Sequence, residues 1–396
     1  MRATLGRLFG DGFRLFFLAA GVFGMLSALY WEGWLGVHAF GGMVTAHAFA
    51  HPPSVWHAHE MVFGYAGAAL GGFFLTAVPS WTGARAARHD FIGLAATLWL
   101  AGRIAVWMSA SIPAFAVAAI DLAFLPVLAA KILTQLLRRP KPQNMMFLAL
   151  LTLLWLSNLA VHADWTGLGG PGAETGLRAG LLSVCAIIAV LGGRITPAFT
   201  RNAMNRAGLV SRLPESRRPF DGAGVALAIL VPLAVLAGFA DHWAGVLALL
   251  CGAAQLARLS GWRSAWTLGK PILWSMHVAF AMLAIGYVLL GIAWLGFGSE
   301  IAALHILGIG AVGGMTLAVM SRAILGHTGR PLVAPAPIVV AYGCMALAAI
   351  ARWIGSSAAI EHYFAAMLVS GAFWIAAMTI FVLAMLPAIL GPKLSD

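Results

Sequence analysis

Long apolar runs alternate with short polar connections along the whole chain, and Pro and Gly stand in most of the connections. Crossing about 30 Å of hydrocarbon takes roughly 20 helical residues, whereas a barrel strand needs only about 10. Twelve runs have the helical length, near residues 14–34, 56–79, 90–110, 113–137, 145–162, 177–200, 221–240, 243–259, 271–295, 300–322, 333–354 and 362–388. The pattern predicts an all-α integral membrane protein with twelve transmembrane helices in one membrane domain, residues 1–396.

The composition excludes an ordinary soluble domain. Hydrophobic residues make up 61% of the 396 residues and charged residues only 9%, against about 25% charged in typical soluble domains. The net charge of +11 is explained by the excess of Lys and Arg in cytoplasmic loops. If both termini are cytoplasmic, only Arg178 and Arg352 fall on the outer side. We therefore expect a lipid bilayer as partner, no nucleic acid, cytoplasmic termini and an outer segment 35–55.

A pair of adjacent glycines recurs at a fixed spacing. The pairs begin at Gly71, Gly192 and Gly313, 121 residues apart each time, on predicted helices 2, 6 and 10. Adjacent glycines let helix backbones approach closely. The spacing predicts three related four-helix units, residues 40–150, 161–271 and 282–392, around a pseudo-threefold axis. The alternative is coincidence in a chain with 46 glycines.

Ionisable residues gather at the start of predicted helix 2, in the sequence HPPSVWHAHE. His57 and Glu60 are three residues apart and share a helix face, whereas His59 is expected to point elsewhere. After alignment of the glycine pairs, His305 of helix 10 lies about one turn deeper than His59. Two histidines from facing helices can ligate a haem iron or help to hold copper. The metal candidates are His57, His59, Glu60 and His305; the alternative is interfacial histidines bonded to water.

Other polar residues interrupt the apolar runs further along the chain. His277 lies inside helix 9 and is either a cofactor ligand or a hydrogen-bonded core histidine. Arg194 and Arg322, with His327 nearby, stand where an arginine needs an anionic partner such as a haem propionate. Arg103 of helix 3 and Asp121 of helix 4 are interpreted as a structural ion pair. His47 and His51 precede helix 2 and are interpreted as interfacial.

Three motifs carry a family resemblance: HAHEMVFGYAGAALGGFFLTAVPSWTG (57–83), GGRITPAFTRN (192–202) and LHILGIGAVGGMTLAVMSRAILGHTGR (304–330). They resemble the NnrS family over nearly the whole chain. The resemblance implies a bacterial inner-membrane protein that contains haem, expected to be b-type, and copper. It also implies a role in denitrification and in protection from nitrosative stress. The family's motif residues map onto His57, His59, Glu60, Arg194, Arg201, His277, His305, Arg322 and His327.

The helix count also resembles, by analogy, the catalytic subunit of haem–copper oxidases, which has haem-ligating histidines on helices 2 and 10. Predicted helices 6 and 7 contain no histidine, so the copper site of those oxidases is not expected. The leading hypothesis is a haem-dependent membrane protein that acts on nitric oxide or its iron adducts; if it is an enzyme, it would be an oxidoreductase served by an electron donor. The alternatives are a transporter of an anion or metal, with Arg194 and Arg322 at its site, and a non-catalytic haem-based sensor of nitric oxide.

Overall fold

The computed structural model describes residues 2–394, whose regular secondary structure is helical, with no strand among them. The chain divides into two compact units. The first unit comprises Met1–Gly180, Ala323–Pro331 and Phe381–Asp396, and the second comprises Leu181–Arg322 and Leu332–Ile380. Three of the four boundaries fall within the helices α9, α14 and α16, and the fourth lies between Pro331 and Leu332, in the connection from α14 to α15.

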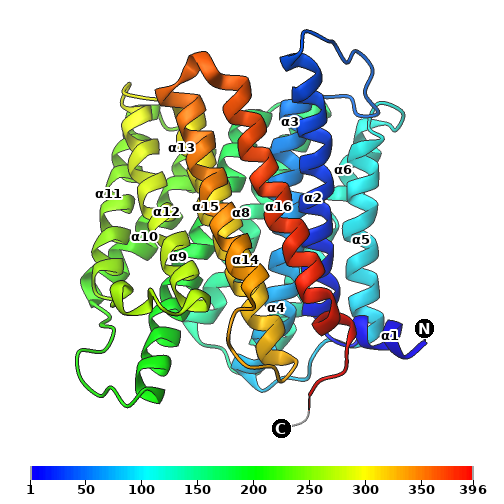
Figure 1. Ribbon diagram of the computed structural model, residues 1–396. Coiled ribbons are helices and arrows are strands. Elements are labelled where there is room, and N and C mark those ends of the chain that lie inside the picture. Colours follow the sequence, from blue (N-terminus) through cyan, green and yellow to red (C-terminus); the bar gives the residue numbers. More distant parts are fainter. Residues whose placement is uncertain (1, 395–396) are drawn as a thin grey trace. The chain divides into compact units, whose positions relative to one another are not determined.

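The first half of the chain contains nine helical segments, one of them a π-helix. They are α1 (Arg2–Leu8), α2 (Gly12–Ala39), α3 (Pro53–His59), the π-helix η1 (Glu60–Ala66), α4 (Gly67–Thr82), α5 (His89–Trp107), α6 (Ala114–Asp121), α7 (Phe124–Leu136) and α8 (Pro142–Trp165). Helix α2 packs against α4, beside it in Figure 1. The glycine pair of α4 makes this contact close, because a Cβ on Gly72 would lie 2.7 Å from the ring of Phe17.

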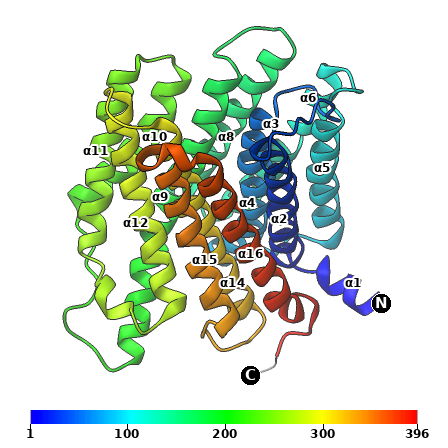
Figure 2. The ribbon, with the colours of Figure 1, turned by 45° about the horizontal axis from the view of Figure 1, so that its top comes forward.

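The second half contains twelve segments. They are α9 (Ala173–Arg206), α10 (Arg218–Leu236), α11 (Asp241–Ser260), the 3₁₀ turn η2 (Ser264–Thr267), α12 (Pro271–Trp294), α13 (Glu300–His305), the π-helix η3 (Ile306–Gly313), α14 (Gly314–His327), α15 (Ala336–Trp353), the π-turn η4 (Ile354–Ala358), the 3₁₀ turn η5 (Ile360–His362) and α16 (Tyr363–Leu390). Helices α11 and α12 lie side by side (Figure 2).

The prediction of twelve membrane-spanning helices is confirmed. Twelve helices within the described residues are long and apolar enough to cross a membrane. Several are longer than their apolar runs: the sixth extends over Ala173–Arg206, where the sequence predicted 177–200. A helix satisfies its own backbone hydrogen bonds, so apolar sequence in a bilayer favours it strongly. The threefold repeat, the single domain, the resemblance to oxidases and the cytoplasmic termini stay predictions.

Candidate metal centre

Six polar side chains gather inside the first unit. We call them the buried polar cluster: His59, Glu60, Arg103, Asp121, Asn158 and His162. They come from α3, η1, α5, α6 and α8, and none is more than 6% exposed. Ionisable groups inside a membrane protein are costly and usually mark a functional site, so this cluster is the strongest candidate in the unit.

Arg103 joins the two carboxylates of the cluster. Its Nη1 donates to Glu60 Oε1 at 2.7 Å, and its Nη2 donates to Asp121 Oδ1. The ion pair that the sequence predicted between Arg103 and Asp121 is therefore confirmed. A buried charge without a partner is strongly destabilising, and the arginine and the two carboxylates compensate one another here.

His59 is held at both ring nitrogens. Nδ1 lies 2.9 Å from Glu60 Oε1, and Nε2 lies 3.0 Å from Asn158 Oδ1. The expectation that His59 points away from Glu60 was wrong. The regular α-helix ends at His59 and a π-helix begins at Glu60, so the angular spacing of an α-helix does not hold at this junction. A π-segment of this kind is frequent at functional sites.

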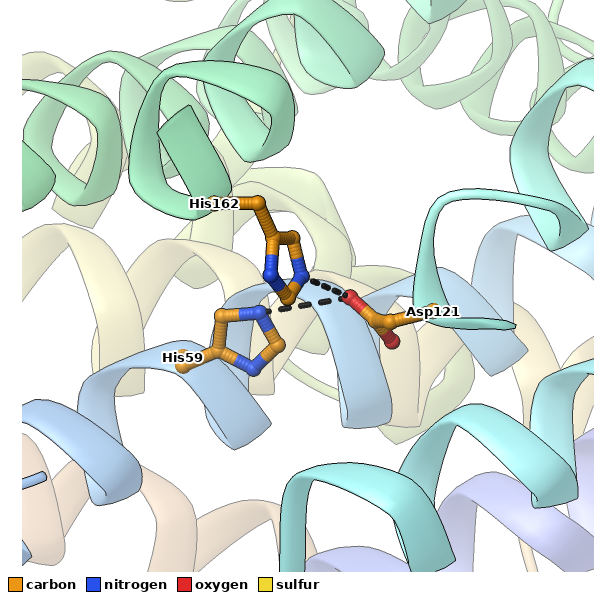
Figure 3. Close-up of side chains that lie close together, drawn as sticks. All are labelled: His59, Asp121 and His162. Atoms are coloured by element: carbon orange, nitrogen blue, oxygen red, sulfur yellow. Dashed lines mark hydrogen bonds and ion pairs between the residues drawn. The ribbon is translucent and has the colours of Figure 1, made fainter. Parts of the chain in front are cut away.

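Asp121 is the centre of the arrangement. His162 Nε2 lies 2.9 Å and His59 Nε2 lies 3.4 Å from its Oδ2, as the dashed lines in Figure 3 show. Asn158 Nδ2 donates to the same oxygen at 2.8 Å. One ligand atom from each of His59, Asp121 and His162 lies within 4.8 Å of the others. We call these three residues the candidate metal centre.

The two ring nitrogens of His162 differ in their hydrogen bonding. Its Nε2 is bonded to Asp121, whereas its buried Nδ1 has no hydrogen-bond partner among the described residues. A histidine that ligates a metal generally donates its other ring N–H to a carboxylate or a carbonyl. The lone pair of Nδ1 points away from the Asp121 oxygen, so a metal ion shared with Asp121 would bind at Nε2 and replace this hydrogen bond.

Two glycines make room for the charged side chains. A Cβ on Gly102 would lie 2.7 Å from Asp121 Oδ1, and one on Gly64 would lie 2.9 Å from Arg103 Nη1. The π-helix also exposes the carbonyl of Gly64, which accepts a hydrogen bond from Trp99 Nε1 at 2.9 Å. A cavity of about 10 Å³ borders Arg103, Asp121 and Asn158, which is room for about one water molecule.

The other histidines predicted at the site have different surroundings. His57 is half-buried and stacks on Trp31, with ring centroids 4.6 Å apart. His305 belongs to the second unit, where its Nδ1 lies 2.7 Å from the carbonyl oxygen of Ile301. The pairing of His305 with His57 or His59 stays a prediction.

His277, Arg322, Arg194 and His327 each have different surroundings. His277 is buried with both nitrogens engaged, Nδ1 2.8 Å from Ser264 Oγ and Nε2 2.9 Å from Thr200 Oγ1. Ligation by His277 would require one of these bonds to break. The guanidinium of Arg322 lies 3.9 Å over the ring of Phe199, and Arg194 is exposed. His327 is exposed and stacks on Phe13 at 5.5 Å. Their roles as cofactor ligands stay predictions.

Sequence reasoning missed His162 and Asn158, and it gave Asp121 only a structural role. A signal was present, because His162 follows Asn158 by four residues inside an apolar run, and such residues share one helix face. The sequence could not show that this face of α8 meets the end of α6.

Comparison with known protein families identifies the family of the chain. The family model described as NnrS protein matches residues 7–393. The chain belongs to the NnrS family. Membership supports, at the level of the family, a membrane protein related to nitric oxide. A search of curated proteins found no match.

Proposed function

We propose that this NnrS family member binds one transition-metal ion at His59, Asp121 and His162 and uses it to act on nitric oxide within the membrane. The observation that carries the proposal is the convergence of three buried ligand atoms within 4.8 Å of one another. Two imidazoles and a carboxylate suit copper, iron or zinc, and copper is the ion that the family resemblance favours. Nitric oxide is small and apolar, so it reaches a centre among membrane helices without an aqueous channel.

The neighbouring residues have definite tasks at such a centre. Glu60 accepts from His59 Nδ1 and so fixes the ring with Nε2 toward Asp121. Ligation through Nε2 would replace the hydrogen bond of this nitrogen to Asn158 Oδ1. Asn158 holds Asp121 Oδ2, and Arg103 balances the charge of both carboxylates. A metal ion held by His59, Asp121 and His162 would supply a binding position for a small ligand and a change of oxidation state. Binding requires neutral imidazoles, so uptake of the ion releases any proton held on His59.

Haem binding is a separate part of the proposal. Nδ1–H of His305 donating to the Ile301 carbonyl leaves Nε2 as the basic nitrogen, the tautomer typical of an iron ligand. We infer that His305 ligates a b-type haem, with His57 as the remaining candidate partner on helix 2. Arg322 is proposed to hold a propionate.

The competing function is transport. A buried network of arginine, carboxylate and histidine also marks ion pathways in carriers, and the pairing of Arg103 with Glu60 and Asp121 favours that alternative. Colour separates the two functions, because a haem protein absorbs strongly in the violet and a carrier without a cofactor does not.

An optical spectrum with metal analysis on purified protein tests the function. We expect a metal ion in the wild type and its loss from His162→Ala and Asp121→Asn, because each variant removes a ligand. His242→Ala, which changes an exposed histidine of α11, is the matched control and should keep the metal. Equal metal content in all four proteins would contradict the proposed centre.

The orientation in the membrane is part of the same proposal. The asymmetry of Lys and Arg supports a cytoplasmic position for both termini. A reporter that is active only in the periplasm, fused to the C-terminus, should stay inactive. Activity of that reporter would contradict this topology and would mean that the 40–52 segment lies on the cytoplasmic side.

A further inference from the structure

Trp165 stands between the candidate metal centre and the surface. It is the last residue of α8, and its ring lies 5.0 Å from that of His59 and 5.1 Å from that of His162. The same indole stacks on His51, with centroids 4.0 Å apart and planes 14° apart. Trp165 and His51 are half-buried, whereas His59 is 0% and His162 2% exposed. The indole therefore separates two buried imidazoles from one that is partly accessible.

Apolar rings also border the centre. Phe63 lies 4.9 Å from His59, and Trp99 and Phe124 line the cavity beside Asp121. A cation crossing these rings would lose its hydration without gaining ligands, which is expensive. At Trp165 the surface is polar instead, because the adjacent Asp164 is exposed and His51 is half-buried.

We propose that a metal cation reaches the centre past Trp165, with His51 and Asp164 as its first ligands and the indole as a movable seal. An imidazole and a carboxylate are the donor types of the centre itself, so the ion passes between similar ligands. Trp165 is the last residue of α8 and is half-buried, so its indole lies at the rim of the helical core. This inference rests on the proposed metal centre.

Release of the metal to a chelator tests the seal. Purified, metal-loaded protein is mixed with excess EDTA and the metal lost is followed over time. We expect release from Trp165→Ala to be about tenfold faster than from the wild type, since the aromatic contacts that hold the seal are gone. Trp165→Phe retains a ring and should stay close to the wild-type rate. Equal rates in Trp165→Ala and the wild type would overturn the proposal.

Chemical modification tests the same seal without any metal. Metal-free protein is treated with diethyl pyrocarbonate, and modification of His59 and His162 is measured by peptide mass spectrometry. Both should react about tenfold faster in Trp165→Ala than in the wild type, whereas His277 should react equally in both. Unchanged protection of His59 and His162 refutes the seal. If the wild type binds no metal, the proposed centre fails, and this measurement still decides the access route.

The first ligands are tested by the rate of loading. The double variant His51→Ala, Asp164→Ala should take up Cu(II) several-fold more slowly than the wild type, because the surface loses a carboxylate and an imidazole that concentrate the cation. Its final metal content should equal that of the wild type, since the centre is intact. An unchanged loading rate would remove His51 and Asp164 from the route.

Discussion

Two membrane-spanning helices each contain a π-helix that begins directly after a histidine, and they differ in the residues that surround this histidine. In α3–η1–α4 the α-helix ends at His59, and a π-helix runs to Ala66 before α-helix resumes at Gly67. In α13–η3–α14 the α-helix ends at His305, and a π-helix runs to Gly313 before Gly314. His59 is fully buried between Glu60 and Asn158. His305 is half-buried and bonded to the backbone of its own helix.

The comparison shows that the position of a histidine and its chemical surroundings have different structural origins. The π-helix fixes where each imidazole leaves its helix, but polar side chains from α5, α6 and α8 build a candidate metal centre only around His59. The two π-helices also give a second possible alignment of the predicted repeat. Alignment of the glycine pairs places His305 opposite Phe63, whereas alignment of the π-helices places it opposite His59. Helix α9, which carries the remaining glycine pair, is α-helical over Ala173–Arg206.

The largest difference between the two histidine sites should appear in stability. Asp121→Ala leaves Arg103 with one carboxylate fewer and takes an acceptor from His162, so the free energy of unfolding should fall by about 3–5 kcal/mol. His305→Ala removes one half-buried ring and should cost about 1 kcal/mol or less. Thermal unfolding of both variants in detergent measures the difference. Equal losses would mean that the buried polar cluster carries no special share of the stability.

A smaller effect is expected from crowding the same cluster through its backbone. Gly102→Ala places a Cβ 2.7 Å from Asp121 Oδ1, and overpacking of this kind costs about 1–3 kcal/mol. Gly93→Ala on the same helix has open space around the new Cβ and should be neutral or slightly stabilising, as alanine favours a helix. The same unfolding measurement compares them, and equal stabilities would show that Asp121 moves aside freely.

The smallest effect concerns pH at the rim of the His59 site. Burial, with added repulsion from His59 and His162 and opposed by Asp164, lowers the pKa of His51 from 6.5 to about 4. Between these values the unfolded chain binds a proton that the folded chain does not, so stability falls as pH drops from about 6.5 to 4. His51→Phe keeps a ring beside Trp165 but cannot titrate. Its stability should fall less than that of the wild type over this range; parallel curves would contradict the lowered pKa.

The apolar pattern was sufficient to predict the helices, because spanning length and backbone satisfaction leave few alternatives in a bilayer. The pairing of Arg103 with Asp121 was also predictable, since each is an ionisable residue inside an apolar run. The direction of the His59 side chain was not predictable, because the helical periodicity assumes an α-helix, whereas a π-helix begins at Glu60. His162 was missed for another reason: its neighbour Asp121 meets it only when α6 and α8 pack in three dimensions.

Pulsed electron paramagnetic resonance on the Cu(II)-loaded protein tests the metal centre most directly, because it counts the imidazoles that bind the ion. The structure predicts two coupled histidines in the wild type, one in His162→Ala and one in His59→Ala, with His305→Ala unchanged at two. Two coupled histidines in the wild type and in both of the first variants would contradict ligation by His59 and His162.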